Sequence, residues 1–278
     1  MRSQTQGKVS GADFGNELHF SYSQLNTYLL CPMKYAHSYV YGSVPEHRPV
    51  AMVFGKAIHR AVEQYYLYLK DIEETLPLDH LIDFFRHSFE YGLMDNEIPV
   101  SFKEGEKADG LTTQGINLLK LFYTEIEPQH IVAVEMPFSV PIPDTSSDNG
   151  EHPIKLVGYF DLIEADSEGT ILVGELKTAS QRFNTLRLEN DLQSTIYSYA
   201  SSKLNPAMSD GSCLIRFDVL LKTKEPAFER YFVSRSGEDY NRLFELINTL
   251  LRAIENRIFY RSTGWQCQGC QFRKTCIG

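Results

Sequence analysis

The stretch GYFDLIEADSEGTILVGELKTAS, residues 158–180, decides the fold that the sequence predicts. Two apolar runs of strand length flank a polar turn at residues 166–169, which is typical of a β-hairpin. Asp161 interrupts the first run, and Glu175 and Lys177 interrupt the second. An exposed edge hairpin with a Glu–Lys ion pair is one interpretation. The apolar flanks VGYF, LI and ILV favour the other, a functional site, because burying unpaired charge is costly.

The spacing of these three residues indicates their chemistry. Side chains on a strand repeat every two residues, so Glu175 and Lys177 share a face, and pairing of the strands would bring Asp161 close to Glu175. Two neighbouring carboxylates repel each other unless one is protonated or a cation joins them. Magnesium and manganese choose oxygen ligands of this kind. Lys177 could then hold an attacking water or offset charge that develops on a phosphate.

Hydrophobic periodicity outside the hairpin predicts an α/β protein with a mixed central sheet and a helical N-terminal portion. Helices are expected at residues 18–41 with a break at Pro32, at 54–69 and onward to 123 with breaks near Pro77 and Pro99, at 186–203, and at 237–260. Strands are expected at residues 131–140, 154–165, 170–178, 214–221 and 228–233, with a turn-rich loop at 144–152. We expect residues 1–17 to be a flexible tail and residues 18–278 to form a single domain.

Composition and charge argue against a membrane-spanning or secreted protein and leave binding to a polyanion open. The 278 residues have the composition of an ordinary globular protein, and no apolar run is long enough to cross a bilayer. The polar N-terminus does not resemble a signal peptide, so a cytoplasmic location is expected. The net charge is −9, yet residues 251–278 contain five basic residues and one acidic residue. This basic end could bind a polyanion or could be an ordinary solvated surface.

The five cysteines are unevenly distributed. Cys267, Cys270 and Cys276 lie in the last dozen residues, and Cys31 lies far upstream. In a cytosolic protein this clustering indicates metal binding before it indicates disulfides. Four thiolates suit either a [4Fe–4S] cluster or zinc, and the spacing does not separate the two. Cys213 stands alone beside a predicted strand, where a small buried core residue is expected.

An Asp followed after a gap by Glu-x-Lys on paired strands resembles the PD-(D/E)XK nuclease superfamily. Four further segments resemble its RecB-type branch and the iron–sulfur members of that branch. They are SYSQLNTYLLCPMKY (21–35), FGKAIHRAVE (54–63), DLQSTIYSYA (191–200) and the tail CQGCQFRKTC (267–276). Those members include the CRISPR-adaptation exonucleases of the Cas-four family, the AddB nuclease domain and the nuclease domain of the eukaryotic replication helicase–nuclease.

The resemblance implies a restriction-endonuclease-like core and a role for each matching residue. The ligands implied for magnesium or manganese are His59, Asp161, Glu175 and the carbonyl of Leu176. Lys177 would position the attacking water, with Gln193 and Tyr197, one helical turn apart, orienting Lys177 or a phosphate. The ligands implied for a [4Fe–4S] cluster are Cys31, Cys267, Cys270 and Cys276.

The implied activity is metal-dependent hydrolysis of DNA, by an exonuclease that acts on single strands or on DNA ends. The implied context is CRISPR adaptation or recombination and repair, with proteins of those pathways as possible partners and no membrane. The chain is longer than a minimal Cas-four protein, which points to a helical, acidic insertion at about residues 65–125. The alternatives are a non-catalytic nucleic-acid-binding or scaffold subunit and a zinc-stabilised regulatory domain.

Several other residues are weaker candidates. Glu135 could reach the metals or be an acid at a strand end, and Glu63 is expected to be a surface acid. Plausible phosphate contacts are Arg182, Arg187, Lys222 and Lys224. A tyrosine stripe could stack bases or belong to the core, and it comprises Tyr22, Tyr28, Tyr35 and Tyr39.

Overall fold

The computed structural model describes residues 19–94, 97–143, 154–204 and 213–278. The tail expected at residues 1–17 and the loop expected at 144–152 therefore lie outside the described residues. Chain contacts divide the protein into two units. Unit 1 contains residues 1–46, 137–159 and 236–278, and unit 2 contains residues 47–136 and 160–235.

A mixed sheet forms the centre of the fold, as predicted. Its strand order is β1-β5-β6-β7-β8, and β4 pairs with β5. In unit 2, β6 lies between an antiparallel β5 and a parallel β7, and β8 is antiparallel to β7. The strands are β1 (His19–Phe20), β4 (His130–Pro141), β5 (Lys155–Ala165), β6 (Ile171–Ala179), β7 (Leu214–Leu221) and β8 (Ala227–Val233).

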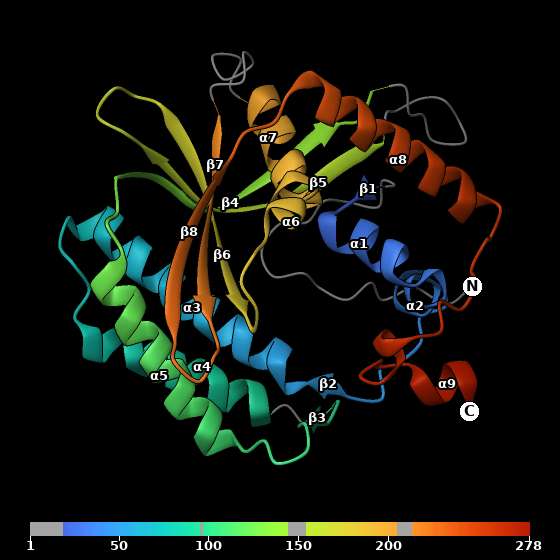
Figure 1. The fold of residues 1–278 in the computed structure, drawn as a ribbon, viewed down its shortest axis with the longest axis horizontal. Coiled ribbons are helices and arrows are strands. Elements are labelled where there is room, and N and C mark those ends of the chain that lie inside the picture. Colours follow the sequence, from blue (N-terminus) through green and yellow to red (C-terminus); the bar gives the residue numbers. More distant parts are fainter. Residues whose placement is uncertain (1–18, 95–96, 144–153, 205–212) are drawn as a thin grey trace. The chain divides into compact units, whose positions relative to one another are not determined.

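Three helices of unit 2 pack against one face of this sheet (Figure 1). They are α3 (Val50–Ile72), α4 (Leu78–Met94) and α5 (Ala108–Glu125), and two short parallel strands, β2 (Arg48–Pro49) and β3 (Val100–Ser101), accompany them. The segment expected as an acidic helical insertion contains α4 and α5. These two helices approach closely at Gly115, where a Cβ would come within 2.0 Å of the Phe85 ring.

Alternation along β6 places helix α7 on the opposite face. Leu176 belongs to the apolar core formed with α3, α4 and α5, whereas its neighbours Glu175 and Lys177 contact side chains of α7. Because side chains alternate along a strand, α7 (Leu192–Leu204) covers the face that α3 leaves free. Glu175 and Lys177 of β6 are therefore enclosed between α3 and α7 within unit 2.

Unit 1 contains the first and last helical segments of the described chain. They are α1 (Tyr22–Leu30), α2 (Pro32–Tyr35), a π-helical turn (Ala36–Val40), α8 (Gly237–Glu255), a 3-10 turn (Trp265–Cys267) and α9 (Arg273–Ile277). A capping box between Ser21 and Gln24 starts α1, and the helix ends at Leu30, with Cys31 as its C-cap before Pro32. The expected helix, break and helix are therefore confirmed. The Tyr28 hydroxyl donates to the Ile258 carbonyl at 2.7 Å, which joins the two segments.

Two helix predictions were wrong at their ends. The helix expected at residues 186–203 is two helices, α6 (Thr185–Glu189) and α7, because the Asp191 carboxylate accepts from the Ser194 amide at 2.7 Å and starts a new helix. The helix expected to reach residue 260 ends at Glu255, because Arg257 has a φ of 53°. None of the helices in the described parts of the chain is long and apolar enough to cross a membrane.

Candidate active site

The hairpin strands bring the two predicted carboxylates together in unit 2. Leu162 of β5 pairs with Gly174 of β6, so Asp161 and Glu175 are the next residues along the ladder. The Asp161 Oδ2 accepts a hydrogen bond from the Leu176 amide at 3.2 Å and lies 3.5 Å from the Nδ1 of His59 on α3. Glu175 is buried. The structure therefore places all the side chains expected to bind a divalent cation in one region.

Lys177, Gln193 and Tyr197 form a closed ring of hydrogen bonds with Glu175. The Lys177 ammonium donates to Glu175 Oε1 at 2.5 Å and to Gln193 Oε1 at 2.6 Å. The Gln193 amide donates to the Tyr197 hydroxyl at 3.0 Å, and that hydroxyl donates to Glu175 Oε2 at 2.8 Å. Both oxygens of the carboxylate and the position of the lysine are therefore fixed by the first two turns of α7.

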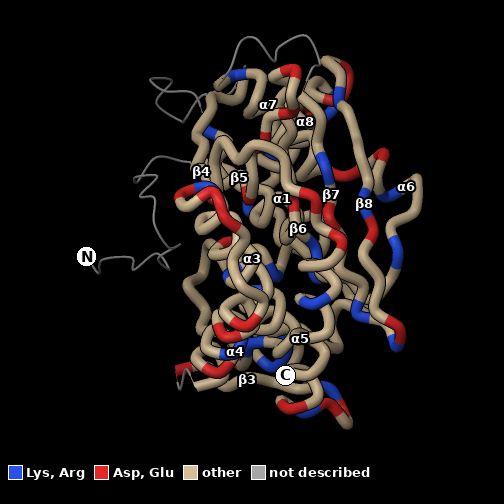
Figure 2. The backbone as a smooth tube through the Cα atoms, turned by 90° about the vertical axis from the view of Figure 1, so that its left-hand side faces the viewer, with Lys and Arg blue, Asp and Glu red and all other residues tan. Residues whose placement is uncertain are grey.

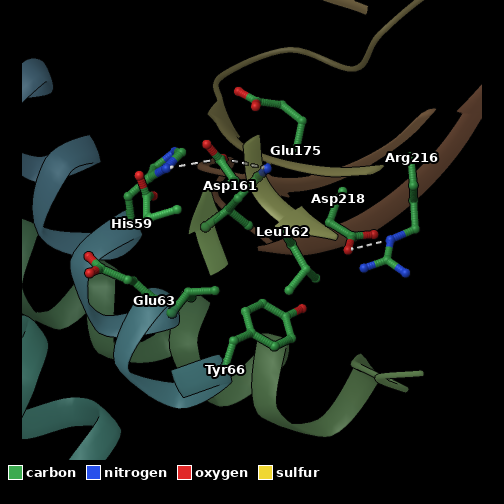
Figure 3. Close-up of a pocket in the computed structure, with 12 residues that line it drawn as sticks. His59, Glu63, Tyr66, Asp161, Leu162, Glu175, Arg216 and Asp218 are labelled. Carbon is green, nitrogen blue, oxygen red and sulfur yellow. Dashed lines mark hydrogen bonds and ion pairs between the residues drawn. The ribbon is translucent and has the colours of Figure 1, made fainter. Parts of the chain in front are cut away.

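A cavity beside these residues collects more acidic groups than the sequence predicted (Figure 3). Its volume is about 360 Å³, including the part that opens to solvent, and its lining includes His59, Asp161, Glu175, Glu63 and Glu135. Glu63 lies one turn after His59 on α3 and also pairs with Arg60. Glu63 was expected to be a surface acid; in the structure it pairs with Arg60 and also lines the cavity.

Glu135 reaches the cavity from β4 through an unusual backbone. Its φ is 48°, a value that non-glycine residues rarely adopt and that is commoner at functional sites than elsewhere. Burial, together with Glu63 and Glu175, raises its pKa to about 7. Glu135 was expected either to reach the metals or to be an acid at a strand end. The structure places it in the middle of β4, where it lines the cavity.

The pKa values of the two hairpin carboxylates are shifted in opposite directions. Burial raises the pKa of Asp161 well above its ordinary value, and Glu175 and Glu135 raise it further. Burial would also raise the pKa of Glu175, but Lys177, His59 and the hydrogen bonds from Lys177 and Tyr197 outweigh burial and lower it. Negative charge at this site therefore favours protonation of Asp161 unless a cation is nearby.

The donor set fits a hard divalent cation. Burial lowers the pKa of His59, so its imidazole is neutral near pH 7 and has a lone pair to offer a metal. Together with the Asp161 and Glu175 carboxylates it supplies nitrogen and oxygen ligands. In the ranges that the structure describes, no three His, Cys, Asp or Glu side chains already have their donor atoms in metal-binding geometry.

The four clustered cysteines also converge, in unit 1. Cys31, Cys267, Cys270 and Cys276 line one hollow of about 470 Å³, part of which is open to solvent. All are free thiols, and burial raises the pKa of Cys276, although Arg261 opposes this. The donor set fits a four-thiolate metal or cluster. Cys213, as predicted, is separate from them and buried in the core.

Several weaker candidates have partners within the chain. Arg182 pairs with Glu229 at 2.6 Å, the Arg187 guanidinium lies 3.5 Å from the Phe183 ring centroid, and the Lys222 ammonium lies 5.3 Å from the Phe54 ring centroid. Lys224 is exposed. Two of the four tyrosines, Tyr28 and Tyr35, are buried in an aromatic cluster and do not offer free stacking surfaces.

A buried ionic group lining the cavity was missed by sequence reasoning. Arg216 of β7 is 1% exposed and pairs with Glu164 at 2.6 Å and with Asp218 at 2.9 Å. Asp218 also pairs with Arg230 of β8, and basic and acidic residues accordingly occur side by side on these strands (Figure 2). The only available signal was the charged pair Arg216 and Asp218 within the apolar run LIRFDVLL.

Comparison with known proteins gives the family to which this fold and site belong. Residues 19–277 match the PD-(D/E)XK nuclease superfamily, so the chain belongs to this superfamily. Family membership and site geometry together support a nuclease. No curated protein matches the sequence.

Two of the solved structures that match this chain illustrate the likeness. A Eubacterium rectale protein described as a "Putative exonuclease" is 10% identical, with a TM-score of 0.52, over 95% of this chain and 90% of its own. At this identity the likeness concerns the fold alone. A protein named SSO0001 is 14% identical, with a TM-score of 0.40, over 92% of this chain and 94% of its own.

Proposed function

We propose that this protein is a magnesium- or manganese-dependent DNA nuclease that acts as an exonuclease on single strands or DNA ends. The observation that carries the proposal is the ring of Glu175, Lys177, Gln193 and Tyr197 beside Asp161. Without a cation, the clustered carboxylates oppose one another. With a lysine held at the same place, the group is suited to hydrolysis of a phosphodiester.

Each residue has a separate task in this proposal. His59, Asp161, Glu175 and the Leu176 carbonyl would hold a divalent cation, which when bound supplies a water of lowered pKa and neutralises phosphate charge. The Lys177 ammonium, fixed by Glu175 and Gln193, donates a hydrogen bond to the attacking water or to a phosphate oxygen. Tyr197 restrains the second oxygen of Glu175, so that both carboxylate oxygens keep their directions.

The four cysteines would hold a [4Fe–4S] cluster, with zinc as the alternative that their chemistry also allows. Cys31 comes from the start of α2, and the other three come from the last described segment of the chain. A group bound by all four would join residues that are far apart in sequence, and its binding free energy would add to the stability of unit 1. We place the protein in the cytoplasm, where free thiols persist.

The C-terminal segment suits a single-stranded polyanion. It carries the basic residues counted above, and Tyr260 and Trp265 expose 61% and 78% of their surfaces. Exposed aromatic rings among cations are the usual platform for unpaired bases. CRISPR adaptation and recombination or repair both require processing of such strands, and partners from either process are compatible with this proposal.

The test is cleavage of single-stranded DNA labelled at either end, with manganese and anaerobically purified protein. The wild type should cleave, and the pattern of labelled products should give the polarity. Lys177→Met should reduce the rate at least about 100-fold, whereas Lys120→Met, at an exposed position on α5, should not. Equal cleavage by wild type and Lys177→Met would contradict the proposal. Binding without cleavage by folded wild type would instead indicate a non-catalytic binding or scaffold subunit.

A further inference from the structure

Arg235 is buried directly after β8 and is bonded to the beginning of helix α7. Its Nε donates to the Thr195 hydroxyl at 3.0 Å. Its Nη2 donates to the Ser194 hydroxyl at 2.7 Å and to the Leu188 carbonyl at 2.6 Å, and it also approaches the Asp191 carbonyl at 3.4 Å. The guanidinium thus joins the end of α6, the cap of α7 and two side chains in the first turn of α7.

Helix α7 needs such a polar anchor because its own sequence does not fix its rotation. Every residue from 193 to 201 is buried, so the helix lacks the contrast between an apolar stripe and a solvated face that usually sets the orientation of a helix. Many of these buried residues carry hydroxyl groups, which must find hydrogen-bond partners. The bonds from Arg235 to Ser194 and Thr195 are specific to one rotation of the helix and one position along its axis.

The anchored turn is also the turn that contacts the candidate catalytic lysine. Gln193 immediately precedes Ser194, and its Oε1 accepts from the Lys177 ammonium at 2.6 Å. The hydrogen bonds of Arg235 reach α6, α7 and its neighbour Ser234, and within the described part of the chain none of them reaches Lys177 or Glu175. An influence of Arg235 on Lys177 would therefore pass through the position of Gln193.

We propose that Arg235 is a positioning residue for the nuclease site, which holds the first turn of α7 so that Gln193 keeps Lys177 in place. The inference rests on the proposed function. The planar guanidinium contacts several acceptors in fixed directions at once, which the single ammonium of a lysine does not reproduce. Displacement of a positioned group by about 1 Å can lower a rate 100-fold, so a contact far from the chemistry can matter.

A double-mutant cycle with Gln193 tests this inference. Arg235→Met should lower the single-turnover rate of DNA cleavage at least about tenfold while changing the affinity for DNA less than about twofold. Arg235→Lys should recover only part of the rate. In a Gln193→Ala background, Arg235→Met should cause little further loss, because the two changes remove the same interaction. Ile196→Val, a mild core change in the same helix, should reduce the melting temperature without reducing the rate tenfold.

Two results would overturn the inference. One is an unchanged rate in Arg235→Met; the other is a full additional loss when that change is added to Gln193→Ala, which is the behaviour of a general structural role. Hydrogen exchange separates this question from the proposed function. Amides of the first turn of α7 should lose protection in Arg235→Met even if the wild type cleaves no DNA, and unchanged protection would also overturn the inference.

Discussion

Neutralising Glu135 should stabilise the protein at alkaline pH in the absence of divalent cations. The carboxylate lines the cavity together with Glu63, Asp161 and Glu175, and its pKa is about 7 against an ordinary 4.5. Burial is the main cause of this difference, followed by Glu63 and Glu175. Glu135→Gln removes the charge and keeps the shape of the side chain, so it isolates the electrostatic contribution.

The expected magnitude follows from the two pKa values. Each pH unit between them corresponds to about 1.4 kcal/mol, which gives an upper limit of about 3.5 kcal/mol for the gain in the free energy of unfolding. Glu135 is only partly buried, and solvent screening reduces this limit, so we expect about 1–2 kcal/mol. Glu135→Gln should also remove the repulsion between Glu135 and Asp161, and this stabilises the folded protein further.

The pH dependence distinguishes this explanation from improved packing. A carboxyl whose pKa is raised by folding binds its proton more tightly in the folded state, so its contribution to stability is complete below pH 4.5 and is lost as the pH rises through 7. Urea unfolding in EDTA should therefore give equal midpoints for wild type and Glu135→Gln at pH 4. At pH 8.5 the midpoint of the variant should be higher by about half a molar.

A matched exposed substitution provides the control. Glu168 lies in the turn between β5 and β6, and Glu168→Gln should leave the midpoint unchanged at both pH values. If Glu135→Gln were no more stable than wild type at pH 8.5, or if its advantage were the same at pH 4, the concentration of negative charge in the cavity would not be the cause. The reasoning about the carboxylate cluster would then be refuted.

Three further predictions concern other parts of the structure. Tyr197→Phe, which removes the hydroxyl that donates to Glu175, should lower the cleavage rate about tenfold or more with little change in the circular dichroism spectrum. If the four cysteines hold iron or zinc as proposed, Cys31→Ala should lose that metal and have a lower melting temperature, whereas Cys213→Ala should keep it; metal analysis of both proteins would show this. Trp265→Ala should weaken single-stranded DNA binding about fivefold or more in a fluorescence anisotropy titration, and unaltered affinity would exclude stacking at this ring.

The hairpin and its carboxylates were predictable because local sequence decides them. The alternation and the turn in residues 158–180 set the pairing, and the pairing brings Asp161 toward Glu175. Gln193 and Tyr197 were predictable as a pair because a helical turn separates them. Their contacts with Lys177 and Glu175 depend on how α7 packs on β6, which the sequence pattern does not specify.

The acidic cavity and the buried arginines were not predictable, for a different reason. Glu63 and Glu135 lie on elements far apart in sequence, and the left-handed backbone at Glu135 has no signal in the motif VAVEMP. Arg216 and Arg235 obtain their partners from several strands and helices. Periodicity shows which face of an element is apolar, but it does not identify which charges meet when the faces come together.

The ends of the helices show how a local polar contact can override periodicity. Leu188 and Leu192 keep the helical spacing of apolar residues, yet the Asp191 carboxylate between them caps α7 and separates it from α6. A prediction from hydrophobic spacing therefore joined the two helices, although the aspartate was visible as a possible cap. This boundary matters for the proposed site, because Gln193 lies in the first turn of the new helix.

Binding of manganese to the hairpin carboxylates is the most direct test of the central claim. The measurement is isothermal titration of anaerobically purified protein with manganese. Wild type and Lys177→Met should both bind manganese. Asp161→Asn and Glu175→Gln should bind it at least about tenfold more weakly. Retention of wild-type affinity in both carboxylate variants would contradict the claim that these charges form a metal site.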